Sequence, residues 1–370
     1  MRLPQHLLES PFFLFQESDD LIAAIGAQPD DPLAAQIQEL SEARLPPIIS
    51  QEVLATMLGV NAGLIWSFIH RSRRHYRRFE IPKGRETRQI VAPRVALKIV
   101  QKWISVHLSK AYAAPDHVFG FVAGRSHIDA AKRHVGAQWA YSADIEDFFG
   151  TTPANLVAES FERLGYSKDA AELCASLTCL NGVLAQGAPS SPVISNLCFA
   201  DMDNQLIEMA EKYDCKVTRY ADDIVFSGKG DFPDDIRVEL RRRFANDGIW
   251  KLSKSKELLQ PLKGRIKIHG LLIGEDSIRL TKGYRNKLRA FAHVIEAQGN
   301  RASNLASLRG HLHYAAHLEN VERQSSGLEP IRMKELLTRS RPKGRSRESF
   351  FGKLRNSVRS ILKADQKPLP

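Results

Sequence analysis

Two adjacent aspartates, Asp222 and Asp223, follow Tyr220 and Ala221, with apolar, strand-like sequence on both sides. Neighbouring carboxylates repel each other and raise each other's pKa, so such a pair is costly unless a cation relieves the repulsion. Mg²⁺ prefers hard oxygen ligands of this kind. A plain turn would also favour Asp, although a turn between two strands more often uses Asn-Gly or Asp-Gly. We therefore expect a divalent-metal site at this turn.

A third carboxylate, Asp144, ends a predicted strand at 138–145 and precedes two aromatic residues, Phe148 and Phe149. Acidic residues are common at strand ends. Together with positions 222 and 223, however, Asp144 would complete three carboxylates on neighbouring strands. Such a set can hold two metal ions ~3.5–4 Å apart, as in phosphoryl transfer. One metal would activate an attacking hydroxyl, and the other would stabilise a leaving pyrophosphate.

The chain has 370 residues and a formal net charge of +11. A positively charged chain of ordinary globular composition makes nucleic acid the default partner. The basic residues are dense in segment 71–94, where two strand-like stretches flank a turn at 82–84. A charge run is usually a solvated surface, but charge on both arms of a hairpin suits phosphate contacts. We favour the second interpretation.

Membrane association is not expected. No apolar run approaches the ~18 residues that a membrane span needs, and the N-terminus lacks the pattern of a signal peptide. The cysteines form no CxxC pair and no zinc-ligand spacing, so we expect reduced core thiols in a cytoplasmic protein. They are Cys174, Cys179, Cys198 and Cys215.

The pattern of strands and helices predicts an α+β body with an antiparallel sheet, followed by a helical, basic region. Residues 1–50 are expected to form a helical extension. Further predicted helices span 95–112, 153–164, 168–180, 193–213 and 233–246. Residues 216–227 are predicted to form a strand, a tight turn and a second strand, and further strands span 257–260 and 265–274.

Several motifs occur in a fixed order along residues 70–275. They are IPKG and TRQIVAP in the basic hairpin, the Asp144 strand, QGAPSSP, YADD, a lysine-bearing turn and HGLLIG. This order resembles the fingers–palm core of reverse transcriptases. The segment GFVAGRS and the compact size resemble bacterial retron reverse transcriptases, whereas diversity-generating and group II intron enzymes differ in the QG motif or carry extensions. The resemblance implies a right-hand polymerase fold, with fingers and palm in 51–275, a helical thumb in 276–340 and a basic tail in 341–370.

Two motifs depart from the retron pattern. Retron enzymes usually carry NAxxH, where this chain has Ala130 in place of the Asn, and VTG, where this chain has Ile268, His269 and Gly270. These departures leave open a defence-associated reverse transcriptase outside the retrons, protein-primed or untemplated. A catalytically idle RNA-binding scaffold is a further alternative, against which the three carboxylates weigh.

The resemblance implies a role for each matching position. Asp144, Asp222 and Asp223 would bind Mg²⁺, with the Ile145 carbonyl as a further ligand. Nucleotide contacts would come from the finger residues Lys83 and Arg88, the steric gate Phe149, the loop residues Gln186 and Gly187, and Lys256, which would protonate pyrophosphate or else be a surface lysine. RNA or primer contacts would come from Arg73, Arg74, Arg77, Arg78, Arg125, His134, His269, Gly270, Arg341 and Arg345, although a packed His134 is equally compatible with the sequence.

The implied activity is RNA-directed DNA synthesis from deoxynucleotides with Mg²⁺. The retron resemblance adds a cognate structured non-coding RNA as template and primer. Synthesis would start at an internal 2′-OH and yield branched multicopy single-stranded DNA. It also implies an antiphage role, with an effector protein encoded nearby as partner.

Overall fold

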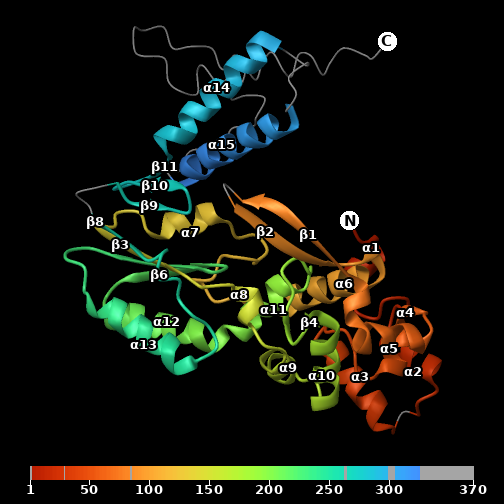
Figure 1. Cartoon of the computed structure of the whole chain (residues 1–370). Helices are drawn as coiled ribbons and strands as arrows, with labels where there is room; N and C mark the ends of the chain where they lie inside the picture. The colour runs from red at the N-terminus through yellow and green to blue at the C-terminus, as the bar shows by residue number, and fades with distance from the viewer. Residues whose placement is uncertain (1, 29, 84–85, 262–264, 299–304, 326–370) are drawn as a thin grey trace. The chain divides into compact units, whose positions relative to one another are not determined.

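A computed structural model describes residues 2–28, 30–83, 86–261, 265–298 and 305–325 (Figure 1). The chain divides into two compact units. The first consists of residues 1–130 and 140–259, and the second contains residues 131–139 and the described residues from 260 onward. None of the described helices combines the length and apolar character that crossing a bilayer requires.

A four-stranded sheet lies at the centre of the chain, in the order β6-β7-β3-β8. Its strands are β3 (Trp139–Asp144), β6 (Lys216–Tyr220), β7 (Asp223–Gly228) and β8 (Leu258–Pro261). β6 and β7 form an antiparallel hairpin. The tight turn between them requires a left-handed backbone at Ala221, with φ +59°. The sheet therefore places β3 next to the YADD hairpin.

Two helices, α12 (Ala200–Lys212) and α13 (Asp235–Asp247), lie along one side of this sheet (Figure 1). The predicted single helix 193–213 is interrupted at Phe199, which separates α11 (Ser191–Cys198) from α12. Phe199 leaves helical geometry, with ψ 2°, and its buried ring packs 4.8 Å from that of Trp250. Aromatic packing in the core coincides with the helix break.

The basic segment forms the predicted hairpin. β1 (Tyr76–Lys83) pairs antiparallel with β2 (Glu86–Pro93) along its whole length. A short 3-10 helix, η1 (Ser72–His75), precedes it, and α6 (Val95–Ala111) follows it. The apolar face of α6, which includes Trp103, is buried and anchors the hairpin to the body.

The remaining helices of the first unit surround the base of the hairpin. Ser50 and Asn61 cap α4 and α5 through side-chain oxygens. Gly59 ends α4 in the left-handed conformation, so two short helices form here. The elements are α1 (Gln5–Glu9), α2 (Ser18–Ile25), α3 (Pro32–Glu42), α4 (Gln51–Leu58), α5 (Ala62–His70), α8 (Phe148–Thr151), α9 (Ala154–Glu162), α10 (Lys168–Thr178), β4 (Cys179–Leu180) and β5 (Val183–Leu184).

The second unit combines a small sheet with two helices. The predicted strand 265–274 is in fact two strands, because His269 and Gly270 adopt positive φ angles of 48° and 85° and form a tight turn. Gly136 donates to the carbonyl of Gly274 at 3.0 Å. The elements are β9 (Lys267–Ile268), β10 (Leu271–Ile273), β11 (Ile278–Leu280), α14 (Lys282–Gln298) and α15 (Leu305–Ser325); α7 (His127–Arg133) leads from the first unit into segment 131–139.

The cysteines are free thiols, as predicted. Three are buried, and Cys215 is partly buried. Burial raises the pKa of Cys179 and of Cys215 to about 12. Thiols of such high pKa are poor nucleophiles at neutral pH.

Candidate active site

The three predicted carboxylates lie at one edge of the central sheet. Asp144 is the last residue of β3, and Asp223 is the first residue of the neighbouring β7. The amide of Ile145 donates to the carbonyl of Asp222 at 2.8 Å. This hydrogen bond joins the end of β3 directly to the YADD turn.

The other side of β3 is fixed equally well. Ser253 donates its amide to the carbonyl of Asp144 at 2.8 Å, and Glu146 donates its amide to the carbonyl of Lys251 at 2.8 Å. The Asp144 backbone is therefore held between the YADD turn and the lysine-bearing segment.

The site carries negative charge that the protein only partly compensates. Burial raises the pKa of Asp222, and the negative charge of Asp144 raises it further. Asp223 acts in the same direction, while Lys256 opposes them. Because a raised carboxyl pKa reports a disfavoured anion, a cation at this site would relieve the repulsion.

Lys256 supplies one positive charge. Its Nζ donates to Oδ1 of Asp144, with 50% of the lysine side chain and 19% of the aspartate side chain exposed. The following residue, Glu257, fixes this segment through hydrogen bonds from Tyr141 at 3.0 Å and from Arg241 at 2.7 Å. The sequence interpretation of Lys256 as an ordinary surface lysine does not describe this contact.

The predicted nucleotide loop packs on the hairpin. Val91 donates its amide to the carbonyl of Gln186 at 2.8 Å. Gly187 has φ +126°, and a Cβ there would lie 2.7 Å from Cγ2 of Ile90. Since side chains alternate along a strand, Arg88 shares the face of Ile90. The structure therefore brings Arg88, Gln186 and Gly187 to the same side of the hairpin.

The other two predicted nucleotide contacts lie close to these elements in the chain. Lys83 ends β1 opposite Glu86. Phe149 lies in α8, five residues after Asp144, and its half-buried ring is 5.8 Å from that of Phe121 and 5.9 Å from that of Phe148. The aromatic neighbours restrict where the Phe149 ring can turn.

Comparison with known proteins identifies the chain. The family model "Reverse transcriptase (RNA-dependent DNA polymerase)" matches residues 81–258. The retron Mx65 reverse transcriptase of Myxococcus xanthus is 30% identical over 83% of this chain and 74% of its own length. The chain belongs to the retron reverse transcriptases. The retron Ec86 reverse transcriptase of Escherichia coli is 28% identical over 64% of this chain and 74% of its own length.

Solved structures resemble this retron reverse transcriptase more distantly. A foamy viral protease–reverse transcriptase covers 78% of the chain, and the chain covers 43% of it, at 14% identity and a TM-score of 0.41. A telomerase from Candida tropicalis covers 93% of the chain, and the chain covers 79% of it, at 9% identity and a TM-score of 0.44.

Family membership confirms that the retron reverse transcriptase is an RNA-directed DNA polymerase. The predicted α+β fold with an antiparallel central sheet is also confirmed. Of the alternatives that the sequence left open, neither the non-retron enzyme nor the idle scaffold agrees with the comparisons.

The donor set of this retron reverse transcriptase fits magnesium. Asp144, Asp222 and Asp223 offer only hard carboxylate oxygens, and the raised pKa of Asp222 marks unbalanced negative charge. In the described ranges, no three His, Cys, Asp or Glu side chains already stand in a metal-chelating arrangement. The ammonium of Lys256 binds Oδ1 of Asp144.

The predicted RNA contacts fall into two groups. Arg73, Arg74, Arg77 and Arg78 are exposed on η1 and β1. The guanidinium of Arg125, in contrast, is bound within the protein, where it donates to the carbonyls of residues 114, 115 and 118. Arg125 therefore braces this loop, while RNA contact at its partly exposed side chain stays a prediction.

Two further RNA predictions concern the second unit. His134 has no exposed surface, so the packed-histidine alternative describes it, and the predicted RNA contact is wrong for the structure as it stands. His269 and Gly270 form the turn between β9 and β10. Arg341 and Arg345 lie outside the described residues.

Sequence reasoning missed the buried residues that contact the backbone of the YADD turn. Arg219 precedes Tyr220 and is fully buried, and it bonds to the equally buried Asp203. Gly120, part of the GFVAG motif, packs against the backbone of Ala221. The sequence did offer one signal for Arg219, because it is a charged residue within a predicted strand.

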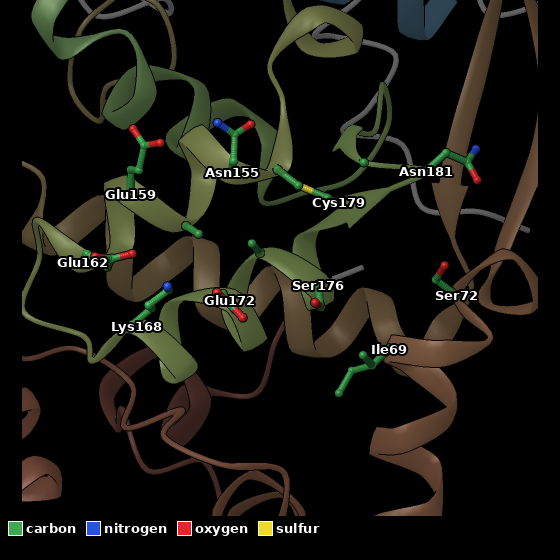
Figure 2. Close-up of a pocket in the computed structure, with 14 residues that line it drawn as sticks. Ile69, Ser72, Asn155, Glu159, Glu162, Lys168, Glu172, Ser176, Cys179 and Asn181 are labelled. Atoms are coloured by element: carbon green, nitrogen blue, oxygen red, sulfur yellow. The ribbon is translucent and has the colours of Figure 1, made fainter.

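A cavity of about 700 Å³ lies elsewhere in the first unit, lined by residues of α9 and α10 and by the turn after β4 (Figure 2). Its lining includes Glu159, Glu162 and Glu172, with Lys168 among them. None of the predicted site residues lines this cavity. Because its acidic side chains repel phosphate, we assign it no part in binding nucleic acid.

Proposed function

We propose that this retron reverse transcriptase copies a cognate structured non-coding RNA into branched multicopy single-stranded DNA by magnesium-dependent nucleotidyl transfer. The proposal places the enzyme in the cytoplasm, in an antiphage defence system with an effector protein encoded nearby. Family membership supports the retron setting. The observation that carries the chemistry is the junction of β3 with the YADD turn through the 2.8 Å bond between Ile145 and Asp222.

The carboxylates have a shared task in this proposal. Asp144, Asp222 and Asp223 hold Mg²⁺, with the carbonyl of Ile145 as a further ligand. When bound, Mg²⁺ activates the attacking hydroxyl and stabilises the leaving pyrophosphate. Lys256, which contacts Asp144, would be the residue that donates a proton to the leaving pyrophosphate. Its direct contact with Asp144 supports this role.

The incoming deoxynucleotide binds on the surface that the hairpin and the QG loop form together. Arg88 and Lys83 grip the triphosphate, where a guanidinium fork suits phosphate oxygens. Gln186 and Gly187 line the pocket, and the absence of a side chain at Gly187 keeps the loop against β2. Phe149 excludes a ribose 2′-OH. The aromatic contacts of its ring support a fixed gate.

The RNA is held by basic surfaces. Exposed arginines of η1 and β1 contact phosphates of the template, and the His269–Gly270 turn supports the primer end. We propose that 51–275 form fingers and palm, that 276–340 form a thumb, and that the tail 341–370, with Arg341 and Arg345, adds RNA contacts. A-form duplexes are recognised through shape and backbone in this manner.

The decisive variant is Asp222→Asn. It removes one ligand charge while keeping the size of the side chain, so primer extension should be abolished and RNA binding should persist. Asp231→Asn is the matched control, since Asp231 is exposed in the loop after β7 and its loss should change neither. Wild-type extension by Asp222→Asn would refute the metal assignment.

The retron product is tested separately. Nucleic acid that copurifies with the enzyme is sequenced before and after treatment with a 2′–5′ debranching enzyme. We expect one abundant RNA joined to DNA, and debranching should release the DNA. A linear product primed elsewhere would contradict the proposed priming. Phage plating on cells that carry the gene with its neighbours, compared with the Asp222→Asn version, tests the defence role.

A further inference from the structure

A fully buried ion pair contacts the YADD turn on the protein side. Nε of Arg219 on β6 donates to Oδ1 of Asp203 on α12 at 2.7 Å, and Nη2 donates to Oδ2 at 2.5 Å. Both side chains have 0% exposure. Burial alone would raise the pKa of Asp203, but the charge and hydrogen bonds of Arg219 outweigh it and lower the pKa. The pair is therefore ionised inside the protein.

The remaining nitrogen of the guanidinium reaches the turn itself. Nη1 of Arg219 donates to the carbonyl of Ala221 at 3.1 Å and to Oδ1 of Asn196 at 3.0 Å. Ala221 is in the left-handed conformation, which a non-glycine residue adopts only at a cost. Its carbonyl belongs to the peptide bond that leads into Asp222. Arg219 thus fixes the peptide plane next to the first catalytic carboxylate.

The same network holds the turn from a second direction. Nδ2 of Asn196 donates to the carbonyl of Gly120 at 3.0 Å. Gly120 lies so close to Ala221 that a Cβ would be only 2.1 Å from the Ala221 amide nitrogen. Phe119 donates its amide to the carbonyl of Arg219 at 2.8 Å. Asn196 therefore links Arg219, which binds the Ala221 carbonyl, to Gly120, which packs on the Ala221 amide.

Stability alone does not explain such a pair. Desolvating two charges costs about as much as their attraction returns, and replacing a buried pair by apolar residues of similar volume is often neutral or stabilising. A planar five-donor fork can satisfy Asp203, Asn196 and Ala221 together, whereas the single ammonium of lysine lacks that geometry. The three hydrogen-bond partners therefore fix the orientation of the Arg219 guanidinium relative to the Ala221 carbonyl.

We propose that Arg219, oriented by Asp203 and Asn196, is a positioning residue that fixes the Ala221 peptide and through it the direction of Asp222 and Asp223. This inference rests on the proposed role of those carboxylates as metal ligands. It predicts that loss of the network displaces the carboxylates, raises the Mg²⁺ concentration needed for half-maximal rate, and lowers kcat without changing RNA affinity.

The main test is the double variant Asp203→Leu with Arg219→Met, which removes both charges together. Its Tm should fall, because Asn196 and the Ala221 carbonyl lose the Nη1 donor and His117 loses its 3.3 Å contact with Asp203. We expect kcat to fall on the order of 10–100-fold, the loss that a misplacement of about 1 Å can produce. The Mg²⁺ concentration needed for half-maximal rate should increase, while the Kd for RNA stays constant.

Two further variants separate orientation from charge. Arg219→Lys keeps a positive charge beside Asp203 but loses the fork, and it should share the kcat and Mg²⁺ defects. Asn196→Ala leaves the ion pair in place and should show the same defects more weakly, which keeps the test valid if the double variant does not fold. The control is Arg163→Gln with Asp201→Asn, an exposed pair at 2.9 Å that joins Asp201 of α12 to Arg163 at the end of α9, which should behave as wild type.

The outcomes are distinct. Wild-type kcat and Mg²⁺ dependence in a folded double variant, or in Asn196→Ala, would overturn the positioning role. If Asp222→Asn is inactive in the same assay, the proposed metal site still holds and only this inference fails. If Asp222→Asn retains activity, the proposed function itself fails.

Discussion

Replacing Gly120 with alanine is expected to slow DNA synthesis without weakening RNA binding. The new Cβ would lie 2.1 Å from the amide nitrogen of Ala221, whereas ordinary contacts begin near 3.4 Å. The two backbones must therefore separate by the difference, 1.3 Å, and we expect the YADD turn to take up part of this shift. A misplacement of about 1 Å at reacting groups can cost on the order of 100-fold in rate, so we expect kcat to fall 10–100-fold.

Single-turnover primer extension with excess enzyme measures this loss, and filter binding of the RNA measures affinity. Gly310→Ala in α15 is the control, because nothing lies within 4 Å of its Cβ position. That change should leave the rate unchanged and stabilise the helix by about 0.5–1 kcal/mol. A Gly120→Ala enzyme with wild-type kcat would refute the close-packing argument, as would a rate defect explained entirely by weaker RNA binding.

Three further predictions concern other parts of the chain. Phe149→Ala should raise ribonucleotide incorporation about tenfold or more relative to deoxynucleotide incorporation, measured by paired single-nucleotide extensions. Unchanged discrimination between the two sugars would contradict the proposed role of Phe149 as steric gate. Lys256→Gln should lower the Mg²⁺ concentration for half-maximal rate about 2–5-fold, because an exposed ion pair worth about 0.5–1 kcal/mol no longer competes for Asp144; a higher requirement would contradict this. Hydrogen bonding from Lys212 lowers the pKa of Glu239 to about 2. This carboxylate therefore stabilises the fold fully above pH ~4.5 and loses its effect as the pH falls toward 2. In urea unfolding, Glu239→Gln should flatten that part of the pH dependence, and an unchanged slope would refute it.

The meeting of Asp144 with the YADD turn could be predicted because its signals are local. Asp222 and Asp223 lie between two apolar strands, and Asp144 closes a third. Each carboxylate is therefore tied to a recognisable strand end. The hairpin of residues 76–93 was predictable for the same reason, since its strand pattern and its turn occur within twenty residues of one another.

The features that sequence reasoning missed depend on long-range packing. Asp203 and Arg219 are sixteen residues apart and belong to a helix and a strand, so neither neighbourhood reveals the partner. His134 was compatible with both a surface and a core position, and only the folded structure shows that it is buried. The break at Phe199 likewise accompanies contacts with Trp250, fifty-one residues later.

The strand that carries Asp144 is flanked by neighbours on both sides, β7 and β8. Adding or deleting one residue in such a strand would reverse the facing of every following side chain and turn the carboxylate to the opposite face. Loops on the surface absorb changes in length far more easily. A library of single-codon insertions, selected for DNA synthesis, should therefore be empty across 139–144 and populated in the exposed loop at 229–231.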